Sequence, residues 1–203
     1  MGRRSPKVEV HLDSGDIKSL TEQEIRAILR AAEELIMTGG RNMLALILKG
    51  SKDKRILEHE LQRSPVYGYY QDLKLDEIMH RIDWMIRQGY LKIEYSDRLP
   101  MIVFSDIGWA IERETYAEEL LLKLDSVLDG HDYRYVETLK DRNRGMILLL
   151  IEKIKETGNV RFVPLLRAWQ AIEYKKVQAE IQNAVNYLLQ EGQIKYVQDK
   201  ETD

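Results

Sequence analysis

Residues 90–104, which read YLKIEYSDRLPMIVF, decide the fold of this chain. Aliphatic and aromatic residues that favour strands fill both arms of this stretch, and the polar residues 96–98 separate them. Two strand-forming arms around a short polar tip are typical of a β-hairpin. The sequence therefore predicts a hairpin, whose meaning depends on the segments before and after it.

Helical patterns precede the hairpin. Thr21 and Glu24 form a capping box that begins a first helix, and the pair Gly39-Gly40 is expected to end it. A second helix over residues 42–49 is apolar on most faces, which indicates burial, and Ser51 is expected to cap a third, shorter helix. A further helix is expected over residues 75–88. Helices followed by a two-stranded hairpin predict a winged helix.

Helical patterns also follow the hairpin, over residues 110–128, 145–156, 163–172 and 177–189. The predicted fold is mainly α with a small β-hairpin wing: a winged-helix domain and a C-terminal α-helical domain. The expected division is a flexible arm over residues 1–18, the winged-helix domain with its flanking helices over residues 19–132, and the helical domain over residues 133–203.

Composition limits the possible settings and functions. The 203 residues are 44% hydrophobic and 32% charged, as in an ordinary globular protein, and none is cysteine. Disulfides, thiolate zinc sites and cysteine nucleophiles are therefore excluded, and a cytoplasmic location without a membrane partner is expected. The net charge of −3 implies that any nucleic-acid site is local, because such binding depends on many cations.

Basic residues gather around Gly50-Ser51, namely Lys49, Lys52, Lys54 and Arg55. Free backbone N–H groups at a helix start, a serine hydroxyl and nearby cations together favour phosphate binding. The alternative interpretation is a capped surface helix with solvated lysines, since a short run of charges usually faces water.

Residues 50–56, GSKDKRI, resemble the RQC domain found at the C-terminal end of RecQ-type helicases. That family has Gly-Ser, three variable residues, a basic residue and an apolar residue. Residues 66–68 (VYG) resemble its Tyr-Gly turn, residues 84–90 (WMIRQGY) its helix–Gly–aromatic junction, and the hairpin that ends near Gly108 its wing. The resemblance covers residues 41–108 and implies a winged-helix domain that binds DNA.

The resemblance also implies which residues bind double-stranded or branched DNA. Ser51 and Arg55 are similar to residues that hold the duplex backbone. Lys52 and Lys54 are expected as supplementary phosphate contacts, and Arg41 is a weaker candidate for the same surface.

The wing of such domains can also part the terminal base pair, which requires an apolar or aromatic tip. The candidate wing residues here are Tyr95, Arg98, Leu99 and Met101. Three of them can stack on a base, but Asp97 at the tip repels phosphate. The wing sequence therefore favours duplex binding over strand separation.

The helicase motor is missing from the sequence. The chain contains no G-x-x-x-x-G-K-[ST] phosphate loop, and the lack of cysteine excludes the four-cysteine zinc module of RecQ-type helicases. The chain thus resembles stand-alone RQC proteins of bacteria. We expect no ATP-driven unwinding, no enzymatic activity, no cofactor, no catalytic residues and no metal site.

Residues 159–189 resemble a HEAT-like helical unit, in which the first helix carries Pro-Leu-Leu and the second is amphipathic. A helicase or another protein is the partner that such helices suggest. A plain helical bundle is the equally favoured alternative, because free-standing arrays usually need at least three repeats.

The favoured function is a non-enzymatic module that grips duplex or junction DNA by its backbone, in repair, replication or recombination beside a separate helicase. One alternative is a winged-helix transcription regulator, in which residues 75–88 read the major groove. The acidic residues of that segment oppose this. A protein-interaction scaffold is the other alternative.

Overall fold

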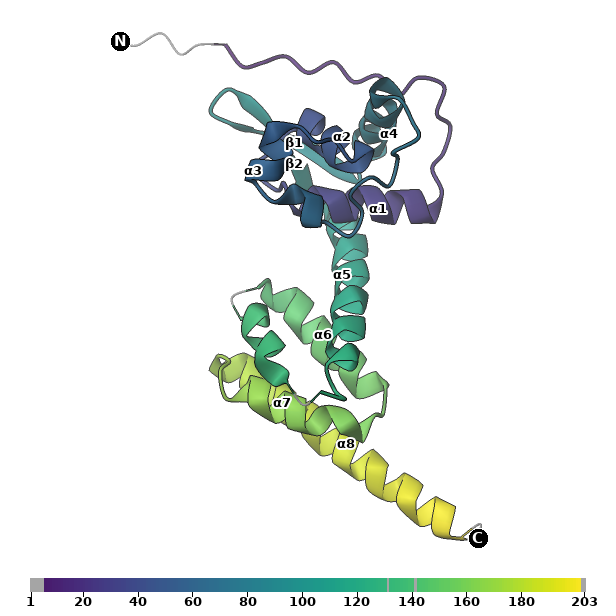
Figure 1. Cartoon of the computed structure of the whole chain (residues 1–203), viewed down its shortest axis with the longest axis vertical. Coiled ribbons are helices and arrows are strands. Elements are labelled where there is room, and N and C mark those ends of the chain that lie inside the picture. Colours follow the sequence, from purple (N-terminus) through teal and green to yellow (C-terminus); the bar gives the residue numbers. More distant parts are fainter. Residues whose placement is uncertain (1–5, 131, 141, 202–203) are drawn as a thin grey trace, which may run out of the picture. The chain divides into compact units, whose positions relative to one another are not determined.

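The computed structural model describes residues 6–130, 132–140 and 142–201 (Figure 1). The first five residues of the predicted arm and the last two residues of the predicted helical domain lie outside these ranges. The chain forms two compact units, Met1–Glu112 and Arg113–Asp203, and the division falls inside helix α5 (Asp106–Ser126). The division predicted from the sequence, after residue 132, lies later in the chain.

Helix α5 takes part in both units, which explains why no linker marks the division. Near its start, Gly108 lies so close to Tyr90 that an added Cβ would come within 2.0 Å of the tyrosine carbonyl oxygen. Near its end, Leu120 and Leu124 are buried in the core of the second unit. One continuous helix thus joins two cores, and no Pro- or Gly-rich break is needed.

Helix α1 (Glu22–Glu33) begins at the predicted capping box. Thr21 Oγ1 accepts a hydrogen bond from the N–H of Glu24 at 3.2 Å, and the Glu24 carboxylate accepts one from the N–H of Thr21 at 2.9 Å. The helix ends earlier than predicted because the chain turns toward the wing. The N–H of Met37 donates to the carbonyl of Ile102 at 3.2 Å, which ties this turn to the second strand.

The remaining helices of the first unit are α2 (Arg41–Lys49), α3 (Lys54–Glu58), the 3-10 helix η1 (Leu61–Arg63) and α4 (Leu75–Arg87). Helix α2 is buried on most sides, as its sequence predicts, with Leu44, Ala45, Ile47 and Leu48 in the core. Ile78, Ile82 and Met85 of α4 pack into the same core. The hairpin packs against this core through Leu91 and Ile102.

The wing is the predicted antiparallel hairpin of β1 (Leu91–Ser96) and β2 (Leu99–Phe104) (Figure 1). Its register pairs Ser96 with Leu99, so the turn consists of Asp97 and Arg98, and Asp97 has a φ of 55°. Asp tolerates this left-handed conformation better than most residues. The mainly α fold with a small wing is therefore confirmed.

Residues 6–18 lie against the first unit, in contrast to the loose arm that their sequence suggests. The N–H of Val8 donates to the carbonyl of Arg98 at 3.1 Å, and Tyr95 Oη donates to the carbonyl of Val8 at 2.9 Å. Further along, the N–H of Asp13 donates to Asp83 Oδ2 at 2.8 Å. Backbone groups make most of these contacts, which explains why the side-chain pattern gave no sign of them.

The described residues of the second unit form most of α5 and, after it, η2 (Tyr133–Leu139), α6 (Arg144–Glu156), η3 (Val160–Phe162), α7 (Val163–Gln170) and α8 (Lys175–Glu201), where η marks a 3-10 helix. Phe162 and Trp169 are its largest fully buried side chains. Apolar faces of α6, α7 and α8 surround them. The C-terminal α-helical domain of the predicted fold is present, and the finer likeness to a HEAT unit stays a prediction.

Helix α8 continues well beyond residue 189, where its predicted pattern stopped. Within the described part of the chain, no helix combines the length and the apolar character needed to cross a membrane.

Candidate nucleic-acid interface

The loop between α2 and α3 is held in place by a second loop. Gly50 ends α2 with a left-handed φ of 73°, and a Cβ added to it would lie 3.0 Å from the Cα of Gly68. The N–H of Gly68 donates to the carbonyl of Ile47 at 2.9 Å, and Tyr67 Oη donates to the carbonyl of Ser51 at 2.9 Å. The Gly-Ser and Tyr-Gly motifs of the sequence therefore pack against each other, and each holds the other loop in place.

The residue that caps α3 is Asp53, where the sequence suggested Ser51. Asp53 Oδ1 accepts a hydrogen bond from the N–H of Arg55 at 2.9 Å, and Ser51 Oγ accepts one from the N–H of Asp53 at 3.2 Å. Helix α3 has five residues. A carboxylate thus lies at the position where the sequence suggested an open helix start for phosphate.

Arg55 forms a two-point ion pair with the same carboxylate. Its Nε and Nη2 donate to the two oxygens of Asp53 at 3.0 Å each, while the Arg55 side chain remains 58% exposed. These side-chain bonds, followed by the backbone bond from Arg55, lower the pKa of Asp53 to about 2. The side-chain bonds to Asp53 also raise the pKa of Arg55. Arg55 is therefore oriented by its own loop.

The two lysines of the loop differ from each other. Lys54 Nζ lies 3.3 Å from Glu58 Oε1 in an exposed ion pair, whereas Lys52 is exposed and forms no ion pair with any described residue. We call Ser51, Lys52, Lys54 and Arg55 the loop site. Acidic neighbours offset two of its three cations.

Arg41 has a structural partner. Its guanidinium contacts Asp83, whose side chain is only 3% exposed, and donates to the carbonyl of His11 at 3.2 Å. Asp83 also accepts the N–H of Asp13. Arg41 thus neutralises a buried carboxylate and ties the arm to the helices, a role that the sequence did not reveal.

Of the wing candidates, Tyr95 contacts the arm, and Arg98 and Leu99 are exposed to solvent. Tyr95 donates its hydroxyl hydrogen to the arm, and Lys7 Nζ lies 4.5 Å from the centre of its ring. Arg98 is exposed beside Asp97, with 3.9 Å between the charged groups. Leu99 is 58% exposed and Met101 is half-buried. Of the predicted stacking residues, Leu99 is the one that faces solvent at the tip.

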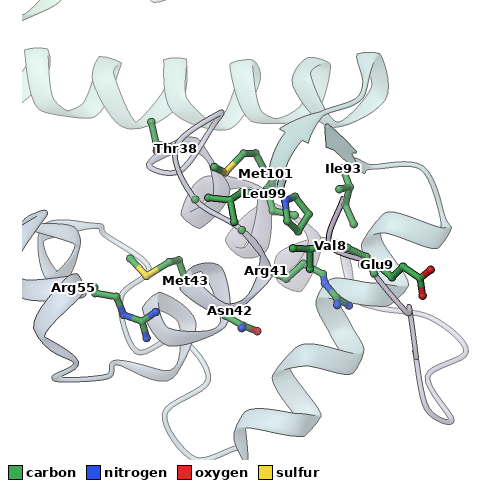
Figure 2. Close-up of a pocket in the computed structure, with 15 residues that line it drawn as sticks. Val8, Glu9, Thr38, Arg41, Asn42, Met43, Arg55, Ile93, Leu99 and Met101 are labelled. Atoms are coloured by element: carbon green, nitrogen blue, oxygen red, sulfur yellow. The ribbon is translucent and has the colours of Figure 1, made fainter. Parts of the chain in front are cut away.

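A groove of about 440 Å³ brings part of the predicted site together (Figure 2). Arg41, Arg55, Leu99 and Met101 line it, whereas Ser51, Lys52, Lys54, Tyr95 and Arg98 do not. The arm supplies lining residues that sequence reasoning missed, which are Val8, Glu9 and Val10. Asn42 and Met43 of α2 complete one side of it. One loop residue, Arg55, and two wing residues, Leu99 and Met101, thus line the same groove.

A known family matches most of the first unit. The model of the RQC domain matches residues 17–124, which is more than half of the chain. This chain belongs to the RQC domain family. Searches among curated proteins and among solved structures found no match. The RQC domain is a DNA-binding winged-helix module of RecQ helicases and has no catalytic role of its own.

The RQC match is longer than the resemblance seen in the sequence. It extends on both sides of residues 41–108 and includes all of α1 and most of α5. Helix α1 contributes the fully buried Ile28 and Leu29 to the core of the first unit, and the half-buried Ile111 of α5 packs against that core. The RQC domain of this chain therefore needs its flanking helices for its core.

Helix α4 of the RQC domain is covered by the arm, which weakens the alternative of a regulator that inserts this helix into DNA. Arg87 donates to Ser14 Oγ at 3.1 Å, and His80 lies 3.6 Å from Asp13. Arg81 points to Glu24, with 3.4 Å between Nε and Oε1. These three side chains of α4 are thus engaged within the domain.

Proposed function

We propose that the RQC domain of this chain binds the backbone of duplex or branched DNA through the loop site and the adjoining groove. The observation that carries the proposal is that Arg55 lines the same groove as Leu99 and Met101 of the wing. A duplex end that rests in the groove meets a cation from one side and an apolar wing from the other.

Arg55 is suited to bind a phosphate without leaving Asp53. A guanidinium has five N–H donors, and the ion pair with Asp53 uses two of its nitrogens, Nε and Nη2. The donors that remain are free to meet a phosphate oxygen, in the fixed planar geometry that favours phosphates. Lys52 adds an unpaired charge beside them, and the Ser51 hydroxyl adds a short-range donor.

The module acts, in this proposal, without chemistry of its own, in the cytoplasm, and beside a separate helicase in repair, replication or recombination. The proposal includes a role for the C-terminal helices in contacting that helicase or another protein. Leu99 is the residue by which the wing would meet a terminal base pair, and strand separation is not part of the proposal.

A titration of the full chain against a labelled blunt duplex at low salt tests the proposal. The double variant Ser51→Ala/Arg55→Ala should weaken binding to blunt and forked duplexes alike, and it should lower the slope of log affinity against log salt by about 0.9 for the lost phosphate contact. Lys74→Ala is the matched control, because Lys74 is an exposed cation of the same unit outside the groove. Unchanged duplex affinity of the double variant contradicts the proposal.

A further inference from the structure

The second unit carries an exposed aromatic ring among lysines. Tyr174 lies in the turn between α7 and α8 and is 58% exposed. Lys140, at the end of η2, places its Nζ 5.8 Å from the centre of the tyrosine ring. Lys175 and Lys176, the first two residues of α8, are also exposed. We call these four residues the Tyr174 cluster.

The three lysines of the Tyr174 cluster have no acidic partner in the described part of the chain. Among the described residues, no carboxylate forms an ion pair with Lys140, Lys175 or Lys176. The acidic neighbour in sequence, Glu173, is 9% exposed and accepts hydrogen bonds from Trp169 Nε1 at 2.9 Å and from the N–H of Tyr174 at 3.2 Å. Glu173 thus fixes the turn to the buried Trp169.

A second tyrosine of this unit shows what is special about the first. Tyr187 is 41% exposed and has Lys155 Nζ 5.7 Å from its ring centre, much like Tyr174 and Lys140. Lys155, however, is paired with Glu152 at 2.5 Å. Tyr187 therefore lies beside a neutralised lysine, and Tyr174 lies among three that are not.

We propose that the Tyr174 cluster binds single-stranded nucleic acid. An unpaired base offers a flat face that stacks on an exposed aromatic ring, and its phosphates attract nearby cations. A duplex keeps its base faces covered, except at its ends. The anchored turn presents the ring with little loss of conformational freedom on binding. This proposal does not rest on the function proposed for the RQC domain.

Binding of the full chain to a labelled oligothymidylate of about 12 nucleotides tests the ring. This probe forms no base pairs with itself, so it reports on single strands alone. Tyr174→Ala should weaken binding by about fivefold or more, because a stacked base contributes roughly 1–3 kcal/mol. Tyr174→Phe keeps the flat face and should stay within about twofold of the parent. Tyr187→Ala is the matched control and should leave affinity unchanged.

The triple variant Lys140→Ala/Lys175→Ala/Lys176→Ala tests the charges. Loss of three phosphate contacts should lower the salt slope of oligothymidylate binding by about 2. Thermal unfolding checks that each variant remains folded. The loop-site variant Ser51→Ala/Arg55→Ala should keep its affinity for oligothymidylate, so the two proposals fail separately.

Three outcomes would overturn the proposal for the Tyr174 cluster. The first is that the parent chain does not bind oligothymidylate at low salt. The second is that Tyr174→Ala binds it as tightly as the parent does. The third is that Tyr174→Ala loses affinity for a blunt duplex as much as for the single strand, because an end or backbone contact would then explain the effect.

Discussion

The loop site of the first unit and the Tyr174 cluster of the second balance their charges in opposite ways. In the loop site, Asp53 pairs with Arg55 and Glu58 pairs with Lys54. In the Tyr174 cluster, the described residues provide no such partner for the lysines. Paired cations are oriented but contribute less net charge, whereas unpaired ones attract any polyanion over a longer range. The first arrangement suits a duplex of regular shape, and the second suits a flexible strand.

The largest expected effect is a loss of stability on removal of Arg41, a cation that supports the fold, in contrast to the cations that are available to DNA. Arg41→Ala removes the partner of Asp83, a carboxylate that is 3% exposed. Loss of one member of a buried pair leaves an uncompensated charge, so the free energy of unfolding should fall by about 3 kcal/mol. Chemical denaturation measures it. Lys52→Ala, which removes an exposed cation without an ion pair among described residues, should leave stability unchanged.

The double variant Arg41→Ala/Asp83→Asn checks the cause of that loss. It removes the buried charge together with its partner and should recover part of the stability. If Arg41→Ala alone unfolds like the parent chain, Arg41 belongs with the loop site and its guanidinium is available to DNA.

The second effect tests how the loop site is held. Gly50 and Gly89 have nearly the same left-handed φ, 73° and 76°, but a Cβ would meet Gly68 at the first position and no atom within 4 Å at the second. Gly89→Ala should therefore cost about 1 kcal/mol of stability from backbone conformation alone. Gly50→Ala should cost more, about 2 kcal/mol, because the neighbouring loop must also shift.

Binding measurements on the two glycine variants test whether the position of the loop site affects duplex binding. Gly50→Ala should weaken duplex binding because it displaces Ser51 from Tyr67, and it should spare oligothymidylate binding by the other unit. Equal stability of the two glycine variants would mean that the packing against Gly68 is unimportant.

A third, smaller effect, on duplex affinity, is expected when the acidic partner of Arg55 is removed, so that this cation is unpaired like the lysines of the Tyr174 cluster. Asp53→Asn keeps a good N-cap residue but removes the negative charge beside Arg55. Since an exposed ion pair contributes less than about 1 kcal/mol, duplex affinity should rise by about threefold. Asp132→Asn in the second unit removes an equivalent partner of Arg134 and should leave duplex affinity as it was. A decrease for Asp53→Asn would show that the carboxylate positions Arg55 for binding.

Local patterns in the sequence predicted most of the fold. The capping box at Thr21, the stop at Gly50 and the hairpin depend on residues a few positions apart, and all three are present. The cap of α3 was misassigned because Ser51 and Asp53 are both good cap residues. In the structure Asp53 is the cap, and the Ser51 carbonyl accepts a tertiary hydrogen bond from Tyr67 Oη.

Contacts between segments that lie far apart in the sequence could not be predicted from it. The arm is joined to the wing and to α4 largely through backbone groups, which carry no sequence signature. Arg41 appeared to be a free cation because its partner, Asp83, is 42 positions away. The Tyr174 cluster likewise depends on Lys140, which the chain brings to the ring from another helix. The family resemblance found the loop site, and only the tertiary structure shows the cluster.

The smallest effect uses two equivalent aspartates, one in each unit. Asp53 with Arg55 and Asp132 with Arg134 have the same spacing and the same bonds from side chain and backbone, and both pKa values are lowered to about 2. A lowered pKa in the folded state means that each pair contributes to stability above about pH 4, and that this contribution is lost as the pH falls toward 2. Side-chain carboxyl NMR titration measures both groups in one sample.

Arg55→Ala should raise the pKa of Asp53 toward its ordinary value of 3.8, because the side-chain bond from Arg55 is the largest cause of its shift. The backbone bond at the helix start remains, so the rise should be incomplete. Asp132 should stay at about 2 and serves as the internal reference. If both aspartates move together, a change of the whole fold is responsible, and Arg55 is then no longer held by a local pair that leaves its other donors for phosphate.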